Sequence, residues 1–203
     1  MFNGQILQDK FVLNILNKKK NGYFLEIGSG DPIEINNSYV LETSFNWKGI
    51  MIEHNETILE KYKLYRPNSI HVISDASTVN YYDLLQKHNA PKNIDYLQID
   101  LEVNNRSTLT TLENLNNTIF DEYTFAVITF EHDIYIGDHF NTRLLSREIF
   151  LNRGYVLVFA DVRNGGCPFE DWYVHPSLVN MDYINTIKSS NSLEFREIMT
   201  RLY

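Results

Sequence analysis

The stretch Gly22-Tyr23-Phe24-Leu25-Glu26-Ile27-Gly28-Ser29-Gly30-Asp31 sets the expected fold of this 203-residue chain. It begins as an apolar run typical of a buried strand and ends in Glu-x-Gly-x-Gly. Its two glycines let the backbone turn tightly and let a ligand approach, because they carry no Cβ. Glu26 lies inside the apolar run, where a carboxylate needs a partner. A bound ligand could supply that partner.

An isolated Gly-x-Gly also fits a strand-to-helix turn that needs glycine for its geometry alone. The full Gly-x-Gly-x-x-Gly dinucleotide fingerprint is not present, because position 33 is Ile33. No Gly-Lys-Ser/Thr of a phosphate-binding loop follows the glycines either. The case for a ligand site therefore depends on the rest of the chain.

Length and composition predict a single globular domain. One domain usually has ~100–200 residues, and the 203 residues here are 43% hydrophobic and 22% charged. Such a chain can bury a proper core. We expect residues 1–20 to form an N-terminal covering helix and residues 21–175 the core. Residues 176–203 should form a tail that packs on the core.

Charge and cysteine content disfavour several classes of function. The formal net charge is −8 and the only basic cluster is the Lys18–Lys20 triplet, so a nucleic-acid partner is disfavoured. A single cysteine, Cys167, excludes an internal disulfide and a multi-cysteine zinc site. The chain shows no signal peptide and no run of ~18 apolar residues. We therefore expect a cytoplasmic protein with no membrane partner.

Short apolar runs alternate with helical patterns along the chain. We expect strands at residues 23–27, 49–53, 69–73, 94–99, 124–130, 155–160 and 171–175, and helices at 4–17, 38–45, 55–65, 80–88, 107–115 and 141–152. Continuous apolar strands in this rhythm predict an α/β fold, with a mostly parallel sheet and helices on both faces. A glycine loop and no helix joins the last two strands, which predicts an antiparallel pair at one edge.

Acidic residues follow the carboxyl ends of five successive strands. Ligands of open α/β sheets bind beyond those ends, so the residues there are candidates for a binding site. In chain order they are Glu26, Glu53-His54, Asp75-Ala76, Asp100 with Glu102, and Glu131-His132-Asp133. We expect these side chains to gather along one edge of the sheet.

The strand-end residues favour S-adenosylmethionine over NAD as the cofactor. An acid after the second strand, such as Glu53, can accept hydrogen bonds from both ribose hydroxyls. Asp75 can accept from the adenine amine, while Ala76 lies flat against the ring. Asp31 and Glu34 crowd the position where a pyrophosphate would bind. S-adenosylmethionine has no phosphate and carries a sulfonium cation, which suits an acidic rim.

Five stretches of the chain resemble the FkbM-type class I methyltransferases. They are Gln-Asp-Lys at 8–10, Gly-Tyr-Phe-Leu-Glu-Ile-Gly at 22–28, Asn-Ser-Tyr-Val-Leu-Glu at 37–42, Trp-Lys-Gly-Ile-Met-Ile-Glu at 47–53 and Ile-Asp-Tyr-Leu-Gln-Ile-Asp-Leu-Glu at 94–102. The resemblance implies a Rossmann-like fold, with a seven-stranded sheet whose last strand is antiparallel. It also implies methyl transfer to oxygen, often to sugar hydroxyls. The chain departs from the usual family pattern at residues 103–105.

The resemblance also suggests which residues bind the cofactor. Glu26, Gly28 and Gly30 would line its methionine end, and Ser38 would face the same pocket. Glu53 would bind the ribose, with His54 beside it. The remaining residues expected at the cofactor are Asp75, Ala76 and Asp100.

A sugar hydroxyl needs a general base, or a metal that lowers its pKa, before it can attack a methyl group. We predict that Asp100, Glu131 and His132 hold Mg²⁺ or Mn²⁺, as acids at these strand ends do in related sugar O-methyltransferases. His132 is the alternative base, so the predicted catalytic residues are Asp100, His132 and Asp133. In the competing interpretation, Glu131 and Asp133 are solvated and His132 packs structurally.

Glu102, Trp172 and Tyr173 are the predicted acceptor-binding residues. Aromatic rings beside carboxylates suit a sugar, because the rings cover C–H groups and the acids accept from hydroxyls. Alternatively, the two aromatic residues alternate on an edge strand and one of them belongs to the core.

The sequence predicts an S-adenosylmethionine-dependent O-methyltransferase that acts on a sugar or glycan. The alternatives are a methyltransferase for another small molecule or a protein, and a catalytically silent scaffold of the same fold. An NAD-dependent oxidoreductase is disfavoured by the incomplete glycine fingerprint. No oligomeric state is predicted.

Overall fold

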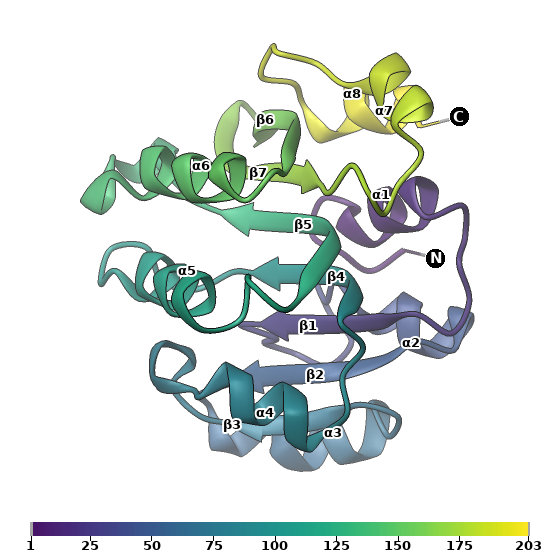
Figure 1. Cartoon of the computed structure of the whole chain (residues 1–203), viewed down its shortest axis with the longest axis vertical. Helices are drawn as coiled ribbons and strands as arrows, with labels where there is room; N and C mark the ends of the chain where they lie inside the picture. The colour runs from purple at the N-terminus through teal and green to yellow at the C-terminus, as the bar shows by residue number, and fades with distance from the viewer. Residues whose placement is uncertain (1, 203) are drawn as a thin grey trace.

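The computed structural model describes residues 2–202, which form a seven-stranded sheet in the order β3-β2-β1-β4-β5-β7-β6 (Figure 1). β7 pairs antiparallel with both of its neighbours, and the other strands run parallel to one another. This confirms the predicted fold class. The strands are β1 (Tyr23–Ile27), β2 (Lys48–Glu53), β3 (Ile70–Ile73), β4 (Asn93–Ile99), β5 (Thr124–Glu131), β6 (Val156–Asn164) and β7 (Cys167–Val174).

Helices cover both faces of the sheet. α1 (Gln8–Ile15), α2 (Tyr39–Phe45), α3 (Leu59–Tyr65), α7 (Met181–Ile187) and α8 (Phe195–Arg201) supply side chains to one apolar cluster. α4 (Tyr81–Lys87), α5 (Ser107–Thr118) and α6 (Thr142–Asn152) supply side chains to a second cluster on the other face. Four short 3₁₀ turns are η1 (Glu56–Ile58), η2 (Ala76–Thr78), η3 (Ile134–Ile136) and η4 (His139–Asn141). Among the described residues, no helix is long and apolar enough to cross a membrane.

The last two strands differ from the expectation in extent. β6 and β7 together span residues 156–174, whereas the apolar pattern indicated only 155–160 and 171–175. The apolar pattern does not extend to the start of β7, because Glu170 and Asp171 are polar. Both side chains are nevertheless buried and hydrogen-bonded. β7 also lies between β5 and β6, so both of its edges are paired.

The backbone turns out of β1 through Gly28, which has a φ of 81°. A Cβ at this position would lie 1.8 Å from the carbonyl oxygen of Asp100, a distance that no side chain can occupy. The Asp100 N–H in turn donates to the Ile27 carbonyl at 3.0 Å. The ends of β1 and β4 are therefore in direct backbone contact.

We expect Gly28→Ala to destabilise the fold more than the same change at another left-handed glycine. Gly165 is the matched control, because its φ is 62° but nothing lies within 4 Å of its missing Cβ. Left-handed strain alone costs about 1 kcal/mol. Backbone displacement should add to that cost at Gly28, for a total of about 3 kcal/mol or more. Urea denaturation of the two variants measures the difference, and equal losses would contradict the role of the close contact.

Candidate functional site

A pocket of about 480 Å³ opens where the parallel strands end. Most of the predicted strand-end residues line it, namely Gly28, Gly30, Glu53, His54, Asp75, Ala76, Asp100, Glu102, Glu131 and Asp133. They come from five different strands, as expected for residues that follow the carboxyl ends of a parallel sheet. A pocket of this volume is in the usual range for small-molecule ligands.

Glu53 is held in place at the end of β2. Its Oε2 accepts from the Gly30 N–H at 3.0 Å, and its Oε1 accepts from the Asn55 N–H at 3.0 Å. His54 Nδ1 also lies 3.0 Å from Oε1. Across the loop, the Tyr62 hydroxyl donates to the Gly30 carbonyl at 2.7 Å. The carboxylate and the glycine loop thus form one connected wall of the pocket.

Open space lies above Gly30, because no atom comes within 4 Å of its missing Cβ. This wall can therefore take a ligand against the backbone.

Asp75 and Ala76 form the next wall, after β3. Hydrogen bonds from the hydroxyl and the N–H of Ser77, at 2.7 and 2.9 Å, lower the pKa of Asp75. The Tyr81 hydroxyl donates to the Ala76 carbonyl at 2.9 Å, and this hydrogen bond holds the η2 turn in place. An ionised carboxylate next to a small apolar side chain can accept from a ring amine and leave room for the ring.

Asp100, Glu131 and Asp133 form an acidic cluster on the opposite side of the pocket. Burial raises the pKa of all three carboxyl groups, and the charge of Asp100 raises the pKa of Glu131 further. Neighbouring carboxyl groups cannot all ionise together, so such a cluster shares protons or binds a cation. Its oxygen ligands are those preferred by Mg²⁺ and Mn²⁺.

His132 does not join the acidic cluster, so its predicted role as base or metal ligand in the pocket is wrong. Its side chain is buried on the other face of β5 and Nε2 lies 3.4 Å from Asp171 Oδ1 and 3.5 Å from Asp161 Oδ1. Successive side chains of a strand point to opposite faces. Glu131, the last residue of β5, faces the pocket, so the following side chain, His132, faces away, and the left-handed backbone of Asp133 (φ 46°) returns that residue to the pocket.

The ligand atoms of His132, Asp161 and Asp171 all lie within 4.8 Å of one another, a spacing that a metal ion could use. Arg147 already occupies this position. Its Nη2 contacts Oδ1 of Asp161 at 2.9 Å and Oδ1 of Asp171 at 2.8 Å. Burial disfavours ionisation of Asp171, but hydrogen bonds from Arg147 and His132 outweigh it and lower the pKa of Asp171. We assign this group to the structure and not to metal binding.

Trp172 and Tyr173 are fully buried, which corrects their predicted role in acceptor binding. The Trp172 ring stacks on Phe11 with centroids 4.5 Å apart, and its Nε1 donates to Glu170 at 2.6 Å. The Tyr173 hydroxyl donates to Asp171 at 3.0 Å on the other face. Both residues belong to the core because β7 is an inner strand and helices cover both of its faces.

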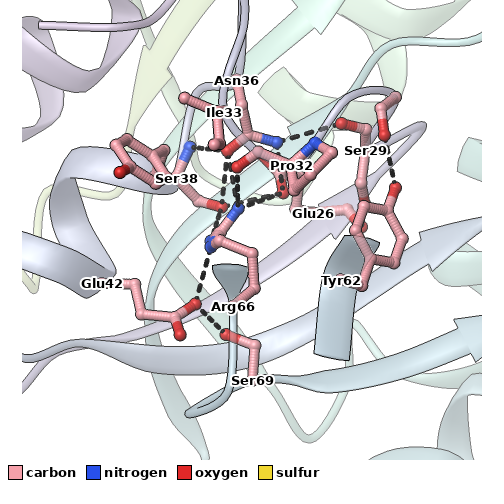
Figure 2. Close-up of polar contacts among 12 residues, drawn as sticks. Glu26, Ser29, Pro32, Ile33, Asn36, Ser38, Glu42, Tyr62, Arg66 and Ser69 are labelled. Carbon is pink, nitrogen blue, oxygen red and sulfur yellow. Dashed lines mark hydrogen bonds and ion pairs between the residues drawn. The ribbon is translucent and has the colours of Figure 1, made fainter. Parts of the chain in front are cut away.

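Glu26 and Ser38 are buried behind the glycine loop and do not line the pocket. The Ser38 hydroxyl donates to Glu26 Oε2 at 2.8 Å, within a network centred on Arg66 (Figure 2). Burial raises the pKa of Glu26, and the positive charge of Arg66 opposes that shift. Ser38 therefore lies behind the lining of the pocket, while Glu26 keeps one oxygen, Oε1, without a hydrogen-bond partner among residues 2–202.

Three residues in or around the site were not predicted from the sequence. Arg66 gave no signal, because an arginine between an amphipathic helix and a proline usually lies on the surface. Asn105 lines the pocket and comes from residues 103–105, where the chain departs from the family pattern. Tyr135 is half exposed on η3, two residues after Asp133, and the negative charge of Asp133 raises the pKa of its phenol.

Comparisons with known proteins identify the fold. No protein-family model matches the chain, and no curated protein matches it either. A TehB-like SAM-dependent methyltransferase from Corynebacterium glutamicum matches with a TM-score of 0.53 at 12% identity, over 83% of this chain and 86% of the other. A protein named as an rRNA methylase from Clostridium thermocellum matches with a TM-score of 0.57 at 12% identity, over 86% and 98%.

A third solved structure is similar over the same region. It is a protein named as a methyltransferase from Streptococcus mutans in complex with SAH, with a TM-score of 0.50 at 15% identity over 86% of this chain and 98% of the other. At these identities the comparisons show a shared Rossmann-like methyltransferase fold.

The acidic cluster should lower stability at neutral and alkaline pH. A carboxyl group whose pKa is higher in the folded than in the unfolded state costs stability as pH rises above its unfolded value of ~4.3. Glutamine cannot ionise. The free energy of unfolding of the Glu131→Gln variant at pH 8 should therefore be higher than that of the wild type by about 1–3 kcal/mol.

The two proteins should be equally stable near pH 4.5. Urea denaturation in a chelating buffer at both pH values measures the effect. Glu148→Gln, an exposed change on α6, is the control. No gain at pH 8, or an equal gain in the control, would contradict the carboxyl coupling.

Proposed function

We propose that this chain is an S-adenosylmethionine-dependent O-methyltransferase of the FkbM type that acts on a hydroxyl of a sugar or glycan. The observation that supports the proposal most is the composition of the pocket. One side carries the glycine loop, Glu53 and Asp75, and the other carries the acidic cluster. A nucleoside with a cationic end suits the first side, and a hydroxyl that must lose a proton suits the second.

The residues of the first side fit S-adenosylmethionine. Gly28 and Gly30 leave the backbone open to a ligand, and Glu53 offers carboxylate oxygens for ribose hydroxyls. Asp75 and Ala76 would hold the adenine. Oε1 of Glu26 is buried and has no hydrogen-bond partner among residues 2–202, so it can accept one more hydrogen bond. When bound, the cofactor supplies an electrophilic methyl group on its sulfonium sulfur.

The acidic cluster would prepare the acceptor. A carboxylate with a raised pKa is a stronger base than a free one, so it can take the hydroxyl proton at neutral pH. We assign this role to Asp133, with Asp100 and Glu131 in support, because all three are only partly buried and line the pocket, and Asp133 lies beyond the end of β5. In the metal-assisted form of the proposal, the same oxygens would hold Mg²⁺ or Mn²⁺, and the cation would lower the pKa of the hydroxyl.

The charge of the pocket favours an uncharged acceptor. Glu102 extends the acidic cluster at the end of β4 and can accept from further hydroxyl groups. An RNA acceptor would meet repulsion from these carboxylates and from a chain with a net charge of −8.

Calorimetric titration with S-adenosylhomocysteine tests the cofactor. We expect micromolar binding by the wild type, because the pocket combines a ribose acceptor with an adenine wall. Glu53→Ala should weaken binding by about 10–100-fold, the usual effect of losing hydrogen bonds to a charged group. Glu60→Ala on α3, where the side chain is 82% exposed, is the control. Binding of NAD in place of S-adenosylhomocysteine, or of neither ligand, would overturn the proposal.

Thermal denaturation with Mn²⁺ tests the metal-assisted form. If the acidic cluster holds the ion, Mn²⁺ should raise the melting temperature at pH 8, because a ligand that binds only the folded state stabilises it. Asp133→Asn should remove most of that rise, whereas Asp138→Asn, an exposed change in the same loop, should keep it. A wild type that does not respond to Mn²⁺ would leave proton transfer to the carboxylates alone.

A further inference from the structure

Arg66 follows α3, and its charged side chain has no exposed surface. All three nitrogens of its guanidinium group donate to acceptors on the loop between β1 and α2 or on α2 itself (Figure 2). The acceptors are Glu42 Oε2 at 2.8 Å, Asn36 Oδ1 at 2.8 Å, Ser38 Oγ at 2.6 Å and the Pro32 carbonyl at 3.3 Å. A buried arginine needs such complete pairing, so the loop and the arginine order each other.

The direction of each hydrogen bond in this network follows from the chemistry of arginine, which donates and never accepts. Ser38 Oγ accepts from Arg66, and its own proton points to Glu26 Oε2 at 2.8 Å, the nearer of its two acceptors. Asn36 Oδ1 also accepts from Arg66. This turns Asn36 Nδ2 toward Glu26 Oε2 at 3.3 Å and the Ser29 carbonyl at 3.0 Å. Two chains of hydrogen bonds therefore end on one carboxylate oxygen.

The other oxygen, Glu26 Oε1, is buried and unpartnered among residues 2–202. Arg66 does not reach it, because its closest approach to the carboxylate is 4.0 Å, from Nη1 to Oε2. A buried carboxylate oxygen without a donor is costly. Glu26 lies two residues before Gly28, which lines the pocket, so a ligand that binds against the glycine loop is the donor that we consider for Oε1.

The charges of the network favour a cationic donor. Arg66 carries one positive charge, and the network contains two carboxylates, Glu26 and Glu42. Arg66 forms its direct ion pair with Glu42, at 2.8 Å. An ionised Glu26 has no direct ion pair of its own, and an ammonium group would neutralise its charge while donating to Oε1.

We propose that Arg66 is a positioning residue for the amino-acid end of the cofactor. Acting through Ser38 and Asn36, it orients Glu26 so that Oε1 accepts a hydrogen bond from the ammonium group of S-adenosylmethionine. This inference rests on the proposed function. It makes the orientation of the Glu26 carboxylate depend on Arg66, which lies 40 positions later in the chain.

Two ligands that differ only at the amino-acid end test the proposal. S-adenosylhomocysteine carries this end, and 5′-methylthioadenosine ends in a methyl group instead. We expect Ser38→Ala to weaken S-adenosylhomocysteine about tenfold and 5′-methylthioadenosine less than about twofold, as measured by calorimetry. Arg66→Lys should show the same selectivity with a larger loss, because lysine cannot donate in both directions from a planar group.

Ser69→Ala is the matched control. Ser69 is also a buried serine of this network, but its hydroxyl donates to Glu42 on the opposite side of Arg66. We expect this variant to bind both ligands within about twofold of the wild type. Thermal denaturation of all three variants shows whether they fold. If the Arg66→Lys variant does not fold, the Ser38→Ala variant alone provides the test.

The outcomes separate this inference from the proposed function. A wild type that binds neither ligand overturns both. A wild type that binds both ligands equally well shows that the amino-acid end makes no favourable contact, which overturns the inference and leaves the cofactor assignment in place. Equal losses of the two ligands in Ser38→Ala mean that the network only stabilises the loop, and they overturn the inference as well.

Discussion

The backbone contact between Gly28 and Asp100 is the constraint on which the rest of the site depends. It brings the end of β1 against the end of β4, so closely that a Cβ on Gly28 would overlap the Asp100 carbonyl. The glycine loop and the acidic cluster extend from these two strand ends in different directions. The pocket lies between these two groups of residues, and the hydrogen bond from the Asp100 N–H to the Ile27 carbonyl ties the two strand ends together.

Buried carboxylates have three different environments in this structure. Asp171 is paired with Arg147, and its pKa is lowered. Glu42 is paired with Arg66, while Glu26 in the same network keeps one oxygen free. The acidic cluster around Glu131 has its pKa values raised by burial and mutual repulsion. The ion pair of Asp171 stabilises the fold. The unpartnered oxygen of Glu26 and the acidic cluster are unfavourable in free energy, and a ligand that binds there can relieve this cost.

Much of the fold could be predicted because it depends on local patterns. The run Phe24-Leu25-Glu26-Ile27 reads as a buried strand and is one, and the same reasoning placed the other parallel strands to within a residue or two. The start of β7 could not be predicted in this way. The expected strand began at Asp171, whereas residues 167–170 also belong to β7, and the hydrogen bond from Trp172 to Glu170 allows that carboxyl group to lie in an inner strand.

The sequence by itself determined which residues follow each strand, and therefore that Glu53, Asp75, Asp100 and Glu131 share one edge of the sheet. This follows from the alternation of strands and helices, since parallel strands end on the same side. Only the tertiary structure decided which way the neighbouring side chains point. His132, Trp172 and Arg66 are buried because partners from distant segments surround them. Their contacts depend on strand order and helix packing, which no local pattern contains.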